Sequence, residues 1–239
     1  MGKKNLLIII PARGGSTGLK NKNIKNLGGK PLLYYSLKAG ELIAEKSKEL
    51  ICSTDSKIIK KIVEKMKYNV PFLRPKNISG KYATDVTFIN HALNFFFYKG
   101  VTFKNGVILR PTAPFRKKKI LNKAYKIFKK SNYSSMRAII KSPITPYRIW
   151  KKKNNTITPV FYSGLYEQFN IPRQKLPETY FQAGNFEFFK VNYRNNIKSV
   201  SGNKIYGYLI QGYLSADIDS KEDLIVANQL FKKHREFIK

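Results

Sequence analysis

The sequence predicts an α/β protein whose mostly parallel central sheet is covered by helices on both faces. Two observations carry this prediction. Short apolar runs alternate with segments of helical periodicity, and the links between them are short. The first apolar run, residues 6–10, is continuous rather than alternating, which is typical of a strand buried on both faces of a parallel sheet. Ligands of such sheets bind where the strands end, so we expect functional side chains there.

Five strands are expected in this sheet, each bounded by residues that interrupt extended pairing. The first run ends at Pro11, and the run at 106–109 stops at Arg110 and Pro111. A strand near the carboxyl end of the chain is expected to return to the sheet after an irregular stretch. The expected strands cover residues 6–10, 49–53, 70–73, 106–109 and 205–210.

Four helices are expected between and after these strands. Gly28, Gly29 and Pro31 mark the start of the first, which should run for about four turns, because proline suits the first turn of a helix. Asp55 is expected to cap the second helix by accepting from its first backbone N–H groups. The third should span 85–98 and the last 220–231. Apolar residues with helical spacing are Leu32, Leu33, Leu37 and Ile43; Ile58, Ile59, Ile62 and Val63; Phe88, Ile89, Ala92, Leu93 and Phe96; and Leu224, Ala227, Leu230 and Phe231.

The regular alternation ends after Lys141. Five prolines, at positions 143, 146, 159, 172 and 177, separate short β-like pieces such as 158–162 and 186–191. We therefore expect residues 142–200 to leave the sheet as an inserted β-rich segment. No internal repeat or low-complexity linker divides the chain, so residues 1–239 are expected to form a single domain.

Composition narrows the class of protein. With 42% apolar residues the chain can build a core, and a single cysteine, Cys52, excludes an intrachain disulfide or a multi-cysteine metal site. The apolar run at 6–10 is far shorter than the roughly 20 residues that span a membrane, and no signal-peptide cleavage site follows it. We expect a cytoplasmic protein without a membrane partner.

The net charge of +32 raises the alternative of a nucleic-acid-binding protein. Only nine of the 46 basic residues are arginine, and the lysines are spread over the whole chain. A nucleic-acid footprint usually clusters on one face or uses arginine to read base edges. The charge therefore favours a solvated surface that attracts anionic ligands, with no specific nucleic-acid partner.

A glycine-rich basic loop follows the first strand and is the strongest local motif. Gly14, Gly15 and Gly18 fall within five positions, so their backbone N–H groups can turn toward one anion, with Ser16 in the same loop. Arg13, Lys20 and Lys22 add positive charge to this loop. The spacing fits neither Walker A nor Gly-x-Gly-x-x-Gly, which leaves a polyphosphate-binding loop or a tight structural turn.

Asp217 and Asp219 form the second motif. Residues two apart in an extended stretch point to the same side, so both carboxylates can bind one hard cation such as Mg²⁺. The alternative is that Asp219 or Ser220 caps the next helix and Asp217 is solvated. A triphosphate loop in the same chain favours the metal pair, since nucleotidyl transfer needs Mg²⁺ held by one or two carboxylates.

Seven segments in register resemble the acylneuraminate cytidylyltransferase family, the CMP-sialic acid synthetases and their relatives for other acidic 2-keto sugars. They are residues 10–16, 29–32, 53–56, 73–75, 110–116, 172–177 and 217–219. The resemblance implies a Rossmann-like three-layer α/β/α nucleotidyltransferase fold, with residues 142–200 as a dimerisation and sugar-site segment. It also implies a homodimer in which this segment of one subunit helps to cover the other's active site. The implied reaction joins CTP and an acidic sugar into a CMP-sugar and pyrophosphate, with Mg²⁺.

The resemblance also implies roles for individual residues. It assigns the triphosphate to Arg13, Lys22 and the loop residues Gly14, Gly15 and Ser16, and gives Arg13, Lys22, Asp217 and Asp219 the catalytic roles, the two aspartates as metal ligands. Asn23 matches a further nucleotide contact. Cytosine and ribose recognition falls to Arg74, Ala83, Thr84 and Asp85. The sugar is assigned to Arg173 and its neighbour Gln174.

The sugar half departs from the family pattern. Arg110 replaces a glutamine, Ala183-Gly184 replaces Asn-Gly, Glu187 replaces a tyrosine, and Thr17 replaces a lysine of the basic loop. Arg110 suits a carboxylate or another anionic group of the substrate, and Glu187 suits an amine or hydroxyls. Alternatively, both residues lie behind those that touch the substrate. The acceptor therefore stays open between a sialic acid-like nonulosonate, a 3-deoxy-octulosonate and another anionic sugar, as does another nucleotide.

Overall fold

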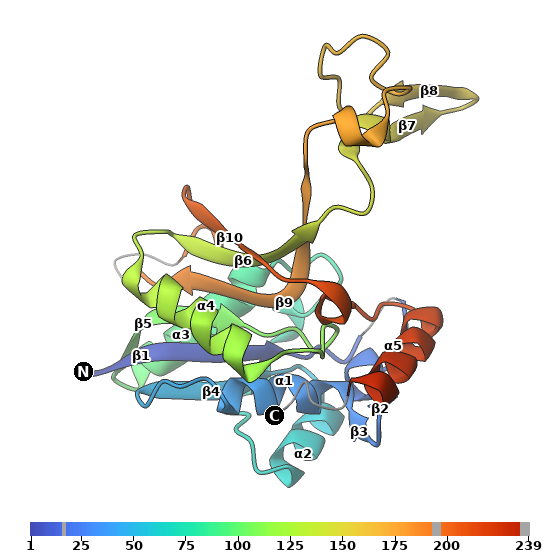
Figure 1. The fold of residues 1–239 in the computed structure, drawn as a ribbon. Coiled ribbons are helices and arrows are strands. Elements are labelled where there is room, and N and C mark those ends of the chain that lie inside the picture. Colours follow the sequence, from blue (N-terminus) through green and yellow to red (C-terminus); the bar gives the residue numbers. More distant parts are fainter. Residues whose placement is uncertain (16–17, 193–196, 235–239) are drawn as a thin grey trace.

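The computed structural model describes residues 1–15, 18–192 and 197–234. A six-stranded mixed sheet lies at its centre, with strand order β10-β6-β9-β5-β1-β4 (Figure 1). β1 is parallel to β4 and β5, β10 is parallel to β6, and β9 is antiparallel to β5 and β6. The expected mostly parallel sheet is confirmed. Its strands are β1 (Gly2–Pro11), β4 (Lys48–Ser53), β5 (Val101–Ile108), β6 (Ser135–Lys141), β9 (Tyr180–Lys190) and β10 (Ile205–Leu209).

Helices cover both faces of the sheet. Side chains of β1 point alternately to the two faces, and the core clusters that they join show which helices cover each face. Leu6, Ile8 and Ile10 belong to one core cluster and Leu7 and Ile9 to another, and all five are fully buried. The first cluster includes residues of α1, α2, α4 and α5, and the second includes the apolar side of α3. Within the described ranges, no helix is long and apolar enough to cross a membrane. The helices are α1 (Leu32–Glu41), α2 (Lys57–Lys65), α3 (Asp85–Tyr98), α4 (Lys118–Lys130) and α5 (Lys221–Lys233).

A tight hairpin precedes α1. Its strands, β2 (Asn26–Leu27) and β3 (Lys30–Pro31), are joined by Gly28 and Gly29, whose φ angles of 54° and 88° favour glycine. A Cβ on Gly28 would lie 2.1 Å from the ring of Phe231 in α5. The glycines that were expected to start the helix therefore form a turn, and α1 has only 10 residues instead of about four turns.

The expected strand at 70–73 is wrong. Asn69 and Leu73 make only isolated parallel bridges, to Ile51 and Thr54. Pro71 lies between them and has no N–H to donate, so a continuous ladder cannot form. The segment still runs beside β4 and leads into the short 3-10 helix η2 (Lys76–Ile78).

α4 and β6 have no counterpart among the expected elements. The signal for α4 is nevertheless in the sequence, because Leu121, Ala124, Tyr125 and Phe128 recur at helical spacing and are all buried. β6 lies next to β9, and its inward residues Met136 and Ala138 are fully buried. These two elements extend the sheet beyond the part that the alternation predicted.

Residues 142–179 leave the sheet between β6 and β9 and project from it as an arm (Figure 1). The arm contains the hairpin of β7 (Trp150–Lys153) and β8 (Thr156–Pro159). The inserted segment was expected to reach residue 200, but residues 180–190 form β9 inside the sheet, where Phe186, Phe188 and Phe189 are buried. Three buried aromatic residues cannot be supported by a thin projecting arm, so the excursion ends at residue 179.

Candidate active site

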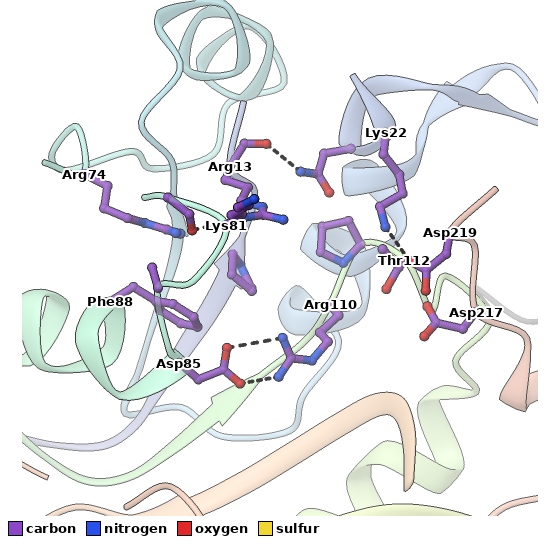
Figure 2. A pocket seen from close by; sticks show the side chains of 15 residues that line it. Arg13, Lys22, Arg74, Lys81, Asp85, Phe88, Arg110, Thr112, Asp217 and Asp219 are labelled. Atoms are coloured by element: carbon purple, nitrogen blue, oxygen red, sulfur yellow. Dashed lines mark hydrogen bonds and ion pairs between the residues drawn. The ribbon is translucent and has the colours of Figure 1, made fainter. Parts of the chain in front are cut away.

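A pocket of about 350 Å³ lies where β1 and β5 end, at the start of α3 (Figure 2). Its lining comes from four segments: the loop after β1, the stretch from residue 74 into α3, the loop after β5, and the stretch before α5. This is the edge at which parallel α/β sheets bind ligands. The lining residues are Pro11, Arg13, Lys22, Asn23, Arg74, Gly80, Lys81, Ala83, Asp85, Phe88, Arg110, Pro111, Thr112, Asp217 and Asp219.

Positive charge predominates in the pocket. Its described lining contains five cations and three carboxylates. The three carboxylates are arranged in two places, Asp85 on one side and Asp217 with Asp219 on the other (Figure 2). Low-dielectric walls lined with excess positive charge favour a polyanionic ligand. The cations are Arg13, Lys22, Arg74, Lys81 and Arg110.

The loop after β1 is held from both sides, which orients Arg13. The buried Asn23 amide donates to the carbonyl oxygen of Arg13 at 2.9 Å, and Arg13 Nη1 donates to the carbonyl oxygen of Gly80 at 3.1 Å. The guanidinium is therefore held at the pocket wall, near Lys81 (Figure 2). Lys81 was missed by the sequence reasoning, since nothing distinguishes it from the many other lysines.

Asp55 holds the glycine loop instead of capping α2. Its Oδ1 accepts from the Gly14 N–H at 2.8 Å, while the Ser56 side chain caps α2 by accepting from the Ile59 N–H. The expected cap at Asp55 is wrong because the neighbouring serine takes that place. Gly14 and Gly15 do not line the pocket, and Ser16 lies outside the described residues.

Asp217 and Asp219 lie side by side at the pocket (Figure 2). The residue between them, Ile218, is fully buried and its N–H donates to the Thr112 carbonyl oxygen at 2.9 Å, so its two neighbours are turned outward. Lys22 Nζ forms an ion pair with Asp219 Oδ1. The extended arrangement predicted from the two-residue spacing is therefore present.

Ser220, rather than Asp219, caps α5. Its side chain accepts from the Asp223 N–H at 3.1 Å, and Asp223 accepts in return from the Ser220 N–H at 2.8 Å. The carboxylate of Asp219 is thus left for Lys22 and the pocket. Two carboxylates are the hard oxygen ligands that Mg²⁺ prefers, and they fit that ion. The described residues contain no third nearby acidic, His or Cys side chain that could complete a metal site, so further oxygens would have to come from a substrate or water.

Arg74 is fixed beneath the opposite side of the pocket. Its guanidinium donates to Ser53 Oγ at 3.2 Å and to the Ser53 carbonyl oxygen at 2.7 Å, and it lies over the ring of Phe88 at 4.8 Å. Burial lowers the pKa of Arg74 from its ordinary value. Ala83 and Asp85 also line the pocket, whereas Thr84 occupies the N-cap position of α3 and does not.

Arg110 stands between two carboxylates. Its Nε donates to Glu187 Oε1 at 2.8 Å, and its Nη1 and Nη2 face Asp85 (Figure 2). Glu187 is only 1% exposed and also pairs with Arg137. Glu187 was expected as a substrate contact, but the structure places it behind Arg110, where a ligand in the pocket cannot reach it. The arrangement matches the alternative in which the residue lies behind the contacting group.

A buried network under the loop after β5 was missed by the sequence reasoning. Arg116, 3% exposed, donates to the carbonyl oxygens of Arg110 at 2.7 Å and Asn185 at 2.5 Å. Asn185 in turn donates to the carbonyl oxygens of Phe115 and Leu214 at 2.7 and 2.9 Å. Burial lowers the pKa of Arg116 to about 9. The network thus connects Arg110 with Leu214, which lies shortly before Asp217 in the chain. In the sequence it was marked only by Arg116, the basic residue that ends the 110–116 segment.

Arg173 and Gln174 lie apart from this pocket. They line a second pocket of about 310 Å³ at the base of the arm, together with Lys141 and Glu178. Arg173 Nη2 donates to the Ser142 carbonyl oxygen at 2.7 Å, within the arm itself. The single chain therefore leaves these two predicted sugar residues outside the main pocket. The predicted nucleotide and metal residues that it does bring together there are Arg13, Lys22, Asn23, Arg74, Ala83, Asp85, Asp217 and Asp219.

Comparison with known proteins gives consistent matches. A family model described as "Cytidylyltransferase" matches residues 7–170. The chain is 30% identical over 239 residues to the N-acylneuraminate cytidylyltransferase of Escherichia coli O18:K1:H7, covering 99% of this chain and 54% of that protein. It is 28% identical over 230 residues to the pseudaminic acid cytidylyltransferase of Campylobacter jejuni, covering 96% of this chain and 97% of that protein. The chain thus spans about half the length of the first relative and nearly all of the second.

Solved structures agree on the fold. The CMP:2-keto-3-deoxy-manno-octonic acid synthetase complexed with CTP matches with a TM-score of 0.68 at 13% identity, covering 96% of this chain and 99% of that one. The 4-diphosphocytidyl-2C-methyl-D-erythritol synthase from Anaerococcus prevotii matches with a TM-score of 0.61 at 17% identity, covering 96% of both chains. These similarities confirm the expected Rossmann-like nucleotidyltransferase fold. With the family model matched from β1 into the arm, the chain belongs to the cytidylyltransferase family.

Proposed function

We propose that this protein transfers CMP from CTP to the anomeric hydroxyl of an acidic 2-keto sugar, a sialic acid-like nonulosonate, and releases pyrophosphate. The observation that carries the proposal is the single pocket in which Arg13, Lys22, Arg110 and the pair Asp217 and Asp219 meet. The relatives named for N-acylneuraminate and pseudaminic acid support this class of acceptor. So does a Legionella pneumophila relative named CMP-N,N'-diacetyllegionaminic acid synthase, 32% identical over 168 residues and covering 67% of this chain and 69% of that protein.

The chemistry follows from the placement of charge. The anomeric hydroxyl gives up its proton to water as its oxygen attacks the α-phosphorus. The bond from that phosphorus to the bridging oxygen breaks, and the electron pair leaves with pyrophosphate. Phosphoryl chemistry of this kind depends mainly on positioning and charge neutralisation. Arg13 and Lys22 neutralise the departing phosphates from the two sides of the pocket on which Figure 2 shows them. Arg74 and Ala83 lie on the side that the nucleoside would occupy.

We further propose that Asp217 and Asp219 hold Mg²⁺ with oxygens of the triphosphate. Such an ion neutralises phosphate charge and orients the α-phosphorus for attack. Asp219 already pairs with Lys22, so the ammonium of Lys22 lies beside the carboxylates, where phosphate oxygens would meet both charges. The fully buried Ile218 keeps both aspartates turned toward the pocket.

We also propose a cytoplasmic homodimer in which the arm of one subunit covers the pocket of the other. Two observations support it: Arg173 and Gln174 lie outside the main pocket of their own chain, and the arm exposes many large apolar side chains. Light scattering should give the mass of two chains, and a monomer at micromolar concentration would contradict this part of the proposal. The exposed apolar residues of the arm include Ile144, Ile157, Val160, Phe161, Tyr162 and Tyr166.

A product screen tests the function. Purified protein with Mg²⁺ is given CTP, UTP, GTP or ATP and one of four sugars: N-acetylneuraminate, pseudaminate, N,N'-diacetyllegionaminate or 3-deoxy-octulosonate. Pyrophosphate release and the mass of the product are measured. We expect a CMP-sugar from CTP and at least one nonulosonate. Release with another nucleotide alone, or only with the octulosonate, would replace the proposed nucleotide or acceptor.

Asp217→Asn and Asp219→Asn test the metal site within the same screen. Each substitution keeps the shape of the side chain but removes a charge, so we expect turnover to fall at least about 100-fold. Circular dichroism and the melting temperature should stay near those of the wild type, because both side chains are exposed. Asp223→Asn is the matched control, since Asp223 belongs to the α5 cap and not to the pocket. Near-normal turnover of both pocket variants would remove the proposed metal ligands.

A further inference from the structure

Four charged residues form a connected cluster at one end of the pocket: Asp85, Arg110, Glu187 and Arg137. They come from four elements, namely the start of α3, the loop after β5, β9 and β6. Asp85 and Arg110 line the pocket, with side chains 30% and 29% exposed, whereas Glu187 and Arg137 lie beneath it at 1% and 10%. The cluster carries two positive and two negative charges, so it is balanced before any ligand binds.

The sheet register brings the two buried members together. Glu187 and Arg137 are direct partners in the antiparallel β6–β9 pair, and directly opposed side chains point to the same face of a sheet. Phe186 and Phe188, on either side of Glu187, belong to the core cluster of the opposite face, so Glu187 faces α3. Arg137 Nη2 also donates to Ser201 Oγ at 2.9 Å, which fixes its far end.

Glu187 holds one edge of the Arg110 guanidinium. Its Oε1 lies 2.8 Å from Nε and 2.6 Å from Nη2, while its Oε2 pairs with Arg137. On the other edge, Asp85 accepts from both terminal nitrogens: Nη2 forms an ion pair with Oδ2, and Nη1 makes a long contact of 3.4 Å with Oδ1. A guanidinium has five N–H donors in one rigid plane, so fixing the Nε edge also fixes where Nη1 points.

We propose that Glu187 and Arg137 are positioning residues that aim Arg110 at the carboxylate of the acceptor sugar. Glu187 clamps the inner edge of Arg110, and Arg137 supplies the charge that keeps Glu187 in place. Nη1, whose contact with Asp85 is long, is the donor offered to the acceptor. This inference rests on the proposed function and adds the means by which an acidic acceptor is selected. Glu187 itself touches no substrate, because it is closed off behind Arg110.

The test compares two acceptors rather than one. One is the acidic sugar of the four-sugar panel that the wild-type protein uses best; the other is the same sugar with its carboxylate converted to a carboxamide. We expect the wild type to favour the carboxylate by about 100-fold in kcat/KM, because a site built for a charged group rejects an analogue lacking it. A merely structural role for Glu187 and Arg137 would lower both rates together and leave this ratio unchanged.

Four variants separate charge from shape. Glu187→Gln and Arg137→Met should reduce the preference about tenfold, through the KM of the acceptor, with the KM of CTP within about twofold of the wild type. Arg137→Lys keeps the charge opposite Glu187 and should retain most of the preference. The double variant Glu187→Gln/Arg137→Met removes both buried charges, so it should fold even where a single variant fails, and it should show the same reduced preference.

The outcomes distinguish the inference from the function beneath it. If the wild type uses none of the four acidic sugars with CTP, the proposed function fails. If the wild type turns over and a folded Glu187→Gln or double variant keeps the full preference for the carboxylate, the function stands and the positioning role is overturned. Loss of CTP affinity equal to the loss for the acceptor would also overturn it, because the effect would then not be confined to the acceptor end.

Discussion

Glu45 lies partly buried between three parts of the fold, and the protein's stability in acid should depend on it. Its side chain, 7% exposed, accepts from Asn5 Nδ2 and the Ser47 N–H at 3.1 Å, from Tyr125 Oη at 2.9 Å and from Lys129 Nζ at 2.6 Å. These contacts join β1, the loop before β4 and α4. Burial alone would raise the pKa of Glu45, but the hydrogen bonds from these groups outweigh it and lower the pKa from 4.5 to about 2.

The size of the effect follows from this shift. Each pKa unit corresponds to about 1.4 kcal/mol, so the native environment of Glu45 stabilises the folded state by about 3 kcal/mol above the ordinary pKa of the carboxyl group. A group whose pKa is lowered by folding gives this stability in full above 4.5 and loses it as the pH falls toward about 2. Wild-type protein should therefore lose about 3 kcal/mol of unfolding free energy between about pH 6 and pH 2 through this residue alone.

Urea unfolding followed by circular dichroism, repeated across this pH range, measures the effect. Glu45→Gln cannot titrate and should be about 2 to 3 kcal/mol less stable than the wild type near pH 7, with the difference closing as the pH falls. Glu64→Gln is the matched control. Among the described residues, its exposed carboxylate makes only an ion pair of 3.7 Å with Lys60. The substitution should therefore change stability by less than about 0.5 kcal/mol. Parallel pH profiles for Glu45→Gln and the wild type would refute the reasoning.

Three further predictions address the phosphate loop, the core and the net charge. Arg13→Ala should lower kcat at least about 100-fold at an unchanged melting temperature. Arg13→Lys should recover only part of the lost kcat, because an ammonium lacks the planar fork of donors. An unchanged kcat and KM for CTP in folded Arg13→Ala would remove the residue from the mechanism. Gly106→Ala would place a Cβ 2.0 Å from the Phe189 ring and should lower the melting temperature or prevent folding. A Cβ on Gly184 would have its nearest neighbours 3.5 Å or more away, so Gly184→Ala should leave the melting temperature nearly unchanged. Fluorescence anisotropy should show generic DNA binding no tighter than about 10⁻⁶ M near physiological salt, and a tight, sequence-selective complex would favour a nucleic-acid role.

Local patterns predicted the elements that depend on local chemistry. The buried run at 6–10, the third helix and the last helix lie close to where periodicity placed them, because each element buries its own apolar residues. The strand at 70–73 failed because Pro71 interrupts pairing, a constraint that was visible in the sequence but was given too little weight. α4 was overlooked although its apolar spacing was present.

The remaining features depend on pairing between distant residues. β9 lies between β5 and β6, and its partners are about 40 to 85 positions away in the chain. The local pattern that marked 186–191 as a β-like piece therefore could not place it in the sheet. The same strand register determines where Glu187 lies. As an acidic residue near a sugar motif it suggested a substrate contact, but its pairing with Arg137 buries it. The pocket itself could be anticipated, since Arg13 and Arg110 both follow strands whose carboxyl ends meet at one edge.

The strands that lead into and out of the arm are paired with each other at its base. Lys141 is paired with Tyr180, and the Ser142 N–H donates to the Thr179 carbonyl oxygen at 2.8 Å. A segment whose two ends are this close behaves as a replaceable module: it can lengthen, shorten or change sequence without shifting the β6–β9 register. Selection can therefore act on the arm while the edge of the sheet that carries the main pocket stays constant, so related proteins can differ in the arm and share one core.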